Sequence, residues 1–354
     1  MSFQSSITNR QSPIQSPAYA KMSQATAISL DLIQGRMYRG AVNRCVNLLV
    51  HYDEGCSANC AYCGLAKKRP GTYQDKSFIH VDWPLFSMDQ IIEAINKAPH
   101  YVKRTCISMI TNGKCRPHTM EMTQRLKQET DLPISILVAP TILDRDDLMG
   151  YQESGADKIG VALDLSTPTL FDQYRGTGVS GPHRWAKYWD ILTHAIDIYG
   201  PYNTGAHLMV GMGETERDII TLMDRLWHMG VCNHLFSFFA EEGSRLWDRP
   251  QPPWDSYLRV QLARYMIEER SLRVKDMTFS PEGRLIHMGG PQDEVTAAIH
   301  SGIPFMTTGC TDNEGKVACN RPFGNCLPDV KQWNYPYPPN TEEIELIQRN
   351  IFGR

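Results

Sequence analysis

Three closely spaced cysteines offer the clearest chemistry in the sequence. Cys56, Cys60 and Cys63 occupy a loop that directly follows an apolar run at 45–52. Three thiolates can ligate three irons of a cubane cluster and leave the fourth iron open to an exogenous ligand. Structural zinc needs four protein ligands, and this loop has no fourth Cys or His. The loop therefore predicts a 4Fe-4S cluster with an open, catalytic iron, with zinc or unliganded thiols as the alternatives.

A second group of cysteines lies near the C-terminus at Cys310, Cys319 and Cys326. Glycines stand among them at Gly309, Gly315 and Gly324. Glycine lets the backbone approach inorganic sulfur closely, so this segment predicts a second, auxiliary 4Fe-4S cluster. Zinc completed by an outside ligand is one alternative, and purely structural thiols are another.

The other four of the ten cysteines are scattered along the chain. Cys45, Cys106 and Cys232 lie within apolar runs, where a free cysteine usually packs as a small core side chain. We expect no chemistry from them, and Cys115 belongs to neither group.

The composition argues against several classes of partner. The formal net charge of the chain is only -3, so no global field attracts nucleic acid or an anionic membrane. No stretch approaches the roughly 20 apolar residues of a membrane span. Residues 1–20 are rich in Ser, Gln and Pro and lack the apolar region of a secretory signal, which predicts a disordered tail on a cytoplasmic protein.

Alternation of apolar runs with amphipathic stretches indicates an α/β fold with a parallel sheet. The expected strands are 45–52, 104–110, 134–139, 157–163, 203–210 and 232–239. Six such units predict a partial (β/α)6 TIM-like barrel, which is open at one side. We expect a helical segment at 21–44, the barrel at 45–275 and a cluster-binding extension at 276–354. The cysteine loop then lies at the C-terminal edge of the first barrel strand, where barrel enzymes place their chemistry.

The spacing Cys56-x-x-x-Cys60-x-x-Cys63, with aromatic Tyr62 before the last cysteine, resembles the radical S-adenosylmethionine superfamily. The resemblance implies that the open iron binds S-adenosylmethionine and that Tyr62 belongs to the cofactor site. It also implies reductive cleavage of this cosubstrate to a 5'-deoxyadenosyl radical, which abstracts hydrogen from an unactivated carbon.

Four further positions are matched to the superfamily's cosubstrate site, in two pairs. Gly211 and Glu214 fit a Gly-x-Ile-x-Gly-x-x-Glu pattern beside the adenine, although His207 and Met209 replace its first glycine and its isoleucine. The match therefore implies a backbone wall only. A helix N-terminus rich in acidic residues is the compatible alternative.

The segment from Asp164 to Arg175 is similar to biotin and lipoyl synthases, where such positions approach the ribose and the methionine carboxylate. A helix cap with a surface arginine is the alternative. Many members carry Gly-Gly-Glu after the second strand to receive the methionine amine, whereas this chain has Thr111 and Asn112 followed by glycine. These two residues are candidate acceptors for the amine, or simply a turn. No catalytic side chain is assigned.

Three longer segments resemble the radical subunits of the two-subunit lipoyl synthases. They are AISLDLIQGRMYRG, GGPQ and GCTDNEGKVACNRPFGN. The resemblance implies sulfur insertion into an octanoyl chain on a lysine of a lipoyl carrier protein or domain, with the auxiliary cluster as sulfur donor. It further implies a second radical subunit and an external electron donor such as ferredoxin or flavodoxin.

Single-chain lipoyl synthases differ, because their auxiliary cysteines precede the radical motif and a C-terminal serine is the fourth ligand. Ser301 is a candidate here only by its nearness in sequence. Two other functions stay open: a radical enzyme acting on a peptide or small molecule, with the auxiliary cluster as electron relay, and a non-catalytic iron–sulfur electron carrier.

Replacing Cys56, Cys60 and Cys63 together by alanine tests the two-cluster prediction. The anaerobically reconstituted protein should carry about eight irons, and the triple variant about four, because the two sites share no proposed ligand. The variant should also yield no 5'-deoxyadenosine from S-adenosylmethionine and dithionite. Loss of all iron from the variant would mean that the two sites are structurally inseparable.

Overall fold

The computed structural model describes residues 14–324, 326–329 and 331–353, and its centre is one open sheet of eight strands. The strand order is β3-β1-β2-β4-β5-β6-β7-β8. The strands are β1 (Tyr19–Met22), β2 (Cys45–Val50), β3 (Leu85–Ser87), β4 (Arg104–Ser108), β5 (Ile134–Val138), β6 (Ala156–Asp164), β7 (Thr204–Val210) and β8 (Val231–Ser237). The pairs from β2 to β8 are parallel, which confirms the α/β fold and the partial barrel.

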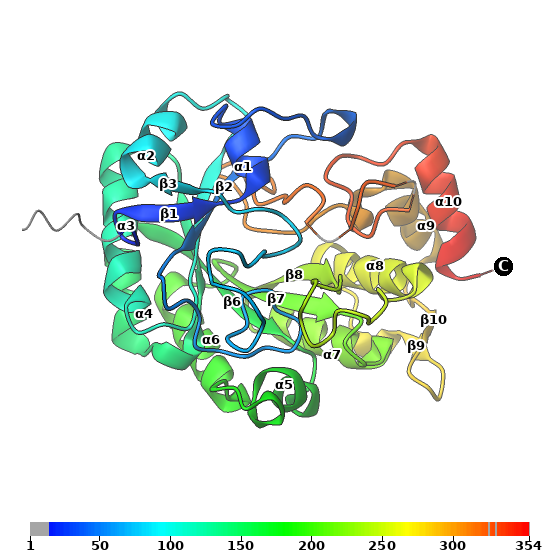
Figure 1. The fold of residues 1–354 in the computed structure, drawn as a ribbon. Coiled ribbons are helices and arrows are strands. Elements are labelled where there is room, and N and C mark those ends of the chain that lie inside the picture. Colours follow the sequence, from blue (N-terminus) through cyan, green and yellow to red (C-terminus); the bar gives the residue numbers. More distant parts are fainter. Residues whose placement is uncertain (1–13, 325, 330, 354) are drawn as a thin grey trace, which may run out of the picture.

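Helices follow the parallel strands and cover the outside of the curved sheet (Figure 1). They are α2 (Met88–Asn96), α3 (Cys115–Glu129), α4 (Arg145–Glu153), α5 (Pro168–Arg175), α6 (Trp185–Tyr199), α7 (Glu216–His228) and α8 (Trp254–Arg270). Ser87 and Gln90 form the capping box that starts α2. Gly155 and Gly230 adopt positive φ just after α4 and α7, which glycine accepts without a Cβ clash.

The N-terminal region differs from the single helical segment expected at 21–44. It contains β1, the short helix α1 (Gln24–Ser29) and one 3-10 turn, η1 (Tyr38–Gly40). Residues 1–13 of the expected tail lie outside the described residues, but Tyr19 and Ala20 already belong to β1. β1 pairs antiparallel with β2 and β3. Four-residue and three-residue strands are too short to show an alternating pattern, so the sequence did not reveal these two.

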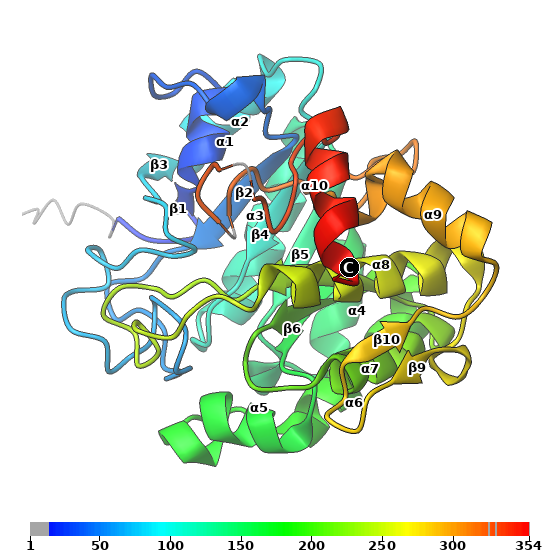
Figure 2. The same cartoon turned by 90° about the vertical axis from the view of Figure 1, so that its right-hand side faces the viewer.

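The segment after α8 contains a small hairpin and two more helices. These are β9 (Thr278–Phe279), β10 (Leu285–His287), α9 (Gln292–Ser301) and α10 (Thr341–Ile351). Between α9 and α10, the orange part of the ribbon lies beside α1 and β2 in both views (Figures 1 and 2). We call the described residues of 303–340 the plug, because hydrogen bonds fasten this segment to the N-terminal ends of the first barrel strands.

Two arginines fasten the plug. Arg104, at the start of β4, is fully buried, donates to the Thr311 carbonyl at 2.7 Å and pairs with both carboxylate oxygens of Asp157 at 2.6 and 2.7 Å. Arg44, just before β2, pairs with Asp312 at 2.9 Å. The plug is therefore attached to the barrel through charge-assisted hydrogen bonds.

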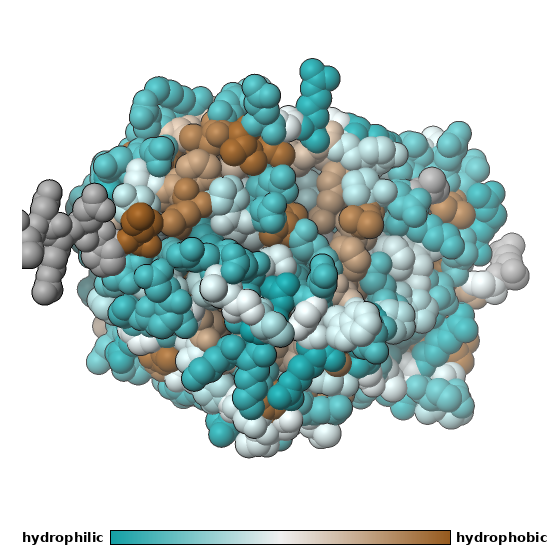
Figure 3. All heavy atoms as spheres, in the orientation of Figure 1, coloured by the Kyte–Doolittle hydropathy of each residue, from teal (hydrophilic) through white to brown (hydrophobic). Residues whose placement is uncertain are grey.

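Hydrophilic residues cover most of the face in Figure 3, and apolar residues gather over α1. Within the described part of the chain, no helix combines the length and the apolar character that crossing a membrane requires.

Arg104→Ala should loosen the plug and destabilise the whole protein. We expect a loss of about 2–3 kcal/mol in the free energy of unfolding, because the variant removes a fully buried side chain and leaves the Asp157 carboxylate and the Thr311 carbonyl without their donor. Urea unfolding followed by circular dichroism measures it. Lys97→Ala, which removes an exposed ion pair with Glu93, is the control and should change little. Equal stability of the two variants would contradict the anchoring role of Arg104.

Candidate radical site and a buried cysteine cluster

The first cysteine loop is held against the loop that follows β4. The Ser57 amide and hydroxyl both donate to the Thr111 carbonyl, at 2.8 and 2.7 Å. The Asn112 side chain donates to the Gly55 carbonyl at 3.0 Å. Thr111 and Asn112 thus position the cysteine loop, and neither lines the cavity described below. Their expected contact with the methionine amine stays a prediction.

The three thiols of this loop are free and form no disulfide. Cys60 is buried, and Cys56 and Cys63 are half-buried. Burial raises the pKa of Cys60 to about 11 and raises the pKa of Cys63 well above its ordinary value, and neighbouring thiols raise both further. Metal binding offsets this cost, because a coordinated thiol is deprotonated by the positive ion. The donor set therefore suits a cluster held by three cysteines.

A hydrogen-bonded triad links this loop to the end of β6. The Tyr62 hydroxyl donates to Asp164 Oδ2 at 2.6 Å, and Arg175 pairs with the same oxygen at 3.0 Å. Arg175 is buried and also donates to the Leu163 carbonyl and the Tyr188 hydroxyl. Asp164 and Tyr62 line the cavity, whereas Arg175 does not. The guanidinium orients Asp164 here, and its expected contact with a methionine carboxylate stays a prediction.

Gly211 and Glu214 form a closed turn after β7. The Glu214 carboxylate accepts from the backbone amides of Gly211 and Met212, at 2.6 and 2.9 Å. Burial raises the pKa of Glu214, although these hydrogen bonds oppose the shift. Gly211 has φ +108°, and a Cβ there would meet the Pro252 ring at 2.8 Å. The turn can provide the backbone wall expected from the sequence, but neither residue lines the cavity.

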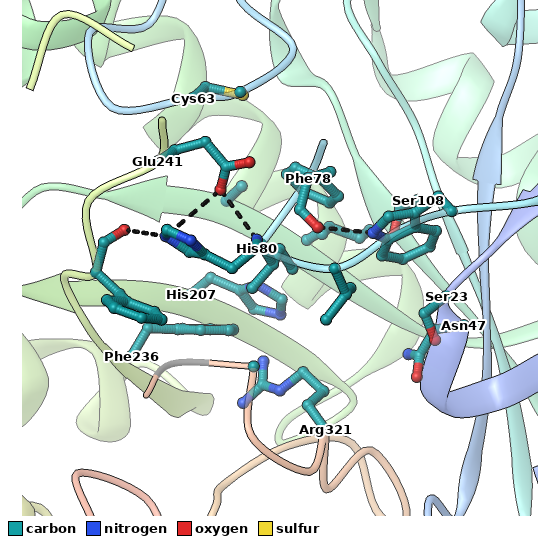
Figure 4. Close-up of a pocket in the computed structure, with 18 of the residues that line it drawn as sticks. Ser23, Asn47, Cys63, Phe78, His80, Ser108, His207, Phe236, Glu241 and Arg321 are labelled. Atoms are coloured by element: carbon teal, nitrogen blue, oxygen red, sulfur yellow. Dashed lines mark hydrogen bonds and ion pairs between the residues drawn. The ribbon is translucent and has the colours of Figure 1, made fainter. Parts of the chain in front are cut away.

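A single cavity runs through the barrel interior from the cysteine loop to the plug. At one side it is lined by Cys63, Gly64 and Glu241, and at the other by Cys106, Cys319 and Arg321. Figure 4 shows Cys63 and Arg321 on opposite sides of this pocket, with His207 between them. Most of its wall is apolar and includes Phe78, Ile79, Val81, Trp83, Leu137, Met209 and Phe236.

The second cysteine group is not assembled as the sequence suggested. Cys310 and Cys319 of the plug pack with Cys45 of β2 and Cys106 of β4 into a separate buried cluster. We call these four residues the plug-side cysteines. Cys45 and Cys106 are buried, as expected of small core side chains, and the packing adds Cys310 and Cys319 as their neighbours.

Cys326 lies outside this group. Its thiol is buried and donates to Gln332 Oε1 at 3.2 Å. Ser301 is also elsewhere, exposed at the end of α9, where its hydroxyl donates to the Ala298 carbonyl. The trio of Cys310, Cys319 and Cys326 is therefore not brought together. The sequence placed Cys45 and Cys106 on consecutive expected strands, but nothing in it indicated that the plug would pack against them.

Two further cavity residues carry features that the sequence did not reveal. The Arg321 guanidinium stacks 3.7 Å from the Phe236 ring centre and donates one hydrogen bond to the Thr308 carbonyl. Its Nε and Nη1 atoms are buried without a partner among the described residues. The sequence marks His207 only as a departure from the adenine motif. Burial lowers its pKa well below the ordinary value, so the cavity wall carries a neutral imidazole there.

An open (β/α)6 barrel with three thiols after its first strand, at the C-terminal edge, defines a class of enzyme built around a loop-held iron–sulfur cluster. Residues 52–226 match the model of the Radical SAM superfamily. These residues are a radical SAM domain, and the protein is a radical SAM enzyme. Such a domain implies a 4Fe-4S cluster and S-adenosylmethionine.

Individual relatives are distant. The chain is 24% identical over 262 residues to a biotin synthase of Streptococcus agalactiae, covering 72% of this chain and 73% of the relative. It is 21% identical over 170 residues to a biotin synthase of Persephonella marina, covering 47% of this chain and 46% of the relative. A crystal structure of methylornithine synthase aligns with a TM-score of 0.46 at 15% identity, covering 68% and 67% of the two chains. The fold class rests on the strand order of this chain itself.

Gly64→Ala tests the geometry of the cysteine loop. A Cβ at Gly64 would lie 2.2 Å from the Ser77 carbonyl oxygen and 2.7 Å from Glu241 Oε1, so the residue beside Cys63 must shift. We expect bound iron to fall by roughly half after reconstitution, because only the first cluster is lost. Gly113→Ala is the matched control, since nothing lies within 4 Å of the position that a Cβ would take there and its iron content should stay unchanged. Normal iron content in both variants would show that the loop tolerates displacement.

Proposed function

We propose that this enzyme inserts sulfur into the octanoyl chain of a lipoyl carrier protein or domain, as a lipoyl synthase working with a second radical SAM subunit. An external donor such as ferredoxin or flavodoxin supplies the electron, and a cluster on the plug side of the barrel supplies the sulfur.

The cavity carries this proposal. We call the loop that carries Cys56, Cys60 and Cys63 the radical loop. The cavity joins Cys63 of this loop to Cys106 and Cys319 of the plug-side cysteines, and its wall between them is mainly apolar. A radical source and a sulfur source must both reach one carbon atom, so a shared cavity is what the reaction requires. An apolar wall favours an alkyl chain over a charged small molecule because burying unpaired charge is costly.

Two further observations support the same reaction. The three segments that resemble the two-subunit lipoyl synthases include two that meet in space: Tyr38 packs edge-on against Phe323 with ring centres 6.1 Å apart. Arg39 also lies 4.5 Å above the Tyr337 ring. In addition, the sequence relatives are named as biotin synthases.

The residues of the chain supply binding and orientation. When bound at its cluster, S-adenosylmethionine supplies a 5'-deoxyadenosyl radical that removes hydrogen from an unactivated carbon. Asp164 offers a carboxylate at the cavity wall that suits paired ribose hydroxyls, and Arg175 and Tyr62 fix its orientation. The aromatic and aliphatic wall excludes water from the alkyl chain and protects a reactive site from side reactions.

Cys319→Ala separates the two halves of the proposed reaction. The variant should still form 5'-deoxyadenosine from S-adenosylmethionine and dithionite under anaerobic conditions, because the radical loop keeps all its cysteines. It should add no sulfur to an octanoyl-lysine peptide, measured by mass spectrometry with and without a related radical subunit. Cys232→Ala, on β8 and outside both cysteine groups, is the control and should keep both activities.

Sulfur insertion by Cys319→Ala would reject the sacrificial role of the auxiliary cluster. Loss of cosubstrate cleavage in a folded variant would instead favour an electron relay. Counting sulfide in the wild-type enzyme after turnover distinguishes these functions independently, since a relay keeps its sulfide and a donor loses it. Absence of any 5'-deoxyadenosine in the wild-type reaction would instead favour the third function, a non-catalytic electron carrier.

A further inference from the structure

We propose that Cys45, Cys106, Cys310 and Cys319 together are the protein ligands of the auxiliary iron–sulfur cluster, and that Cys326 is not a ligand. The proposal deepens the proposed function, because it names the site that would hold the sulfur. It rests on the packing of these four side chains into one buried group, with Leu137 as their apolar neighbour.

The barrel strands contribute the first two ligands. β2 and β4 are parallel neighbours, and their register places Asn47 beside Cys106 and Cys45 beside Arg104. Alternate residues of a strand face the same side of the sheet, so Cys45 shares the side of Asn47. Asn47 and Cys106 both line the cavity. Cys45 and Cys106 therefore both belong to the inward face of the barrel.

The plug contributes the other two ligands through a tight hairpin. The amides of Ala318 and Cys319 both donate to the Cys310 carbonyl, at 2.9 and 3.0 Å, and Thr311 pairs antiparallel with Val317. A Cβ at residue 309 would lie 2.2 Å from the Cys319 carbonyl oxygen, so only glycine allows this approach. The hairpin sets two thiols side by side and presents them to the barrel strands.

The surroundings of the four thiols suit a buried anionic cluster. Four thiolates bring four negative charges, which the iron core offsets only in part, and uncompensated buried charge is strongly unfavourable. Arg104 and Arg321 supply positive charge beside them, and two buried nitrogen atoms of Arg321, Nε and Nη1, have no hydrogen-bond partner among the described residues. Asn47 Nδ2 lies 3.7 Å from Cys319 Sγ, as a donor to a sulfur ligand.

The arrangement favours a cluster over a single ion. Within the described part of the chain, no three His, Cys, Asp or Glu side chains are close enough together to hold one metal ion. An iron–sulfur cluster keeps its thiolates farther apart than one ion does, because iron and sulfide lie between them. Cys326 has no place in this group, since its thiol is turned to Gln332.

The ligand set is tested in full-length protein that lacks the radical cluster. In the Cys56→Ala, Cys60→Ala, Cys63→Ala background, all remaining iron reports on the second site. Single changes Cys45→Ala, Cys106→Ala, Cys310→Ala and Cys319→Ala are added one at a time and compared with Cys326→Ala and Cys232→Ala. Iron, sulfide, zinc and visible absorption are measured after anaerobic reconstitution, and circular dichroism checks that each variant is folded.

We expect about four irons and four sulfides in the background, a loss of at least about half in each of the four plug-side variants, and no loss in the other two. Retained iron in folded Cys45→Ala and Cys106→Ala with loss in Cys326→Ala would overturn the assignment, as would stoichiometric zinc without sulfide. If the alanine variants misfold, thermal unfolding of the background protein with and without Cys45→Ser provides a second test. The proposal predicts that cluster binding protects the background protein against thermal unfolding and does not protect the Cys45→Ser variant.

These readouts do not depend on turnover. A wild-type enzyme with both clusters that adds no sulfur to the octanoyl-lysine peptide would reject the proposed function and leave the ligand assignment standing.

Discussion

The attachment of the plug to the N-terminal ends of β2 and β4 is the constraint on which the rest of the interior depends. In an open barrel of six parallel strands, the end formed by the N-terminal ends of the strands is exposed unless another segment covers it. Here Arg104 binds the Thr311 carbonyl and Asp157 at once, and Arg44 binds Asp312. These bonds hold the plug beside a cavity that has thiols from both cysteine groups in its lining, and they join residues far apart in the sequence.

The two cysteine groups differ in how their geometry is specified. The radical loop takes its three cysteines from eight consecutive residues, so local turns and a few contacts to the next loop suffice. The plug-side cysteines come from two strands and a distant hairpin, so their arrangement depends on strand register and on the docking of the plug. The first group is thus a local feature of the chain, and the second is a product of its tertiary structure.

This difference explains what the sequence could predict. The six parallel strands and the cap at Ser87 follow from apolar runs and local polar residues, and the sequence identified them. The spacing of Cys56, Cys60 and Cys63 was also sufficient to predict a cluster-binding loop. The association of Cys45 with Cys319 did not follow, because no local pattern encodes which strand face a remote hairpin will contact. The burial of Arg175 did not follow for a similar reason: its partner Asp164 was visible in the sequence, but the packing around the guanidinium was not.

The location of the plug-side cysteines also bears on how the enzyme is made. Cys45 and Cys106 leave the ribosome long before Cys310 and Cys319, with β5 to β8 synthesised in between. The radical loop is complete once its own short segment has emerged, whereas the other group forms only after residues 310–319 have emerged and their hairpin has docked. With the proposed ligand set, the second cluster can therefore assemble only after the hairpin has been synthesised, whereas the ligands of the first cluster are available earlier.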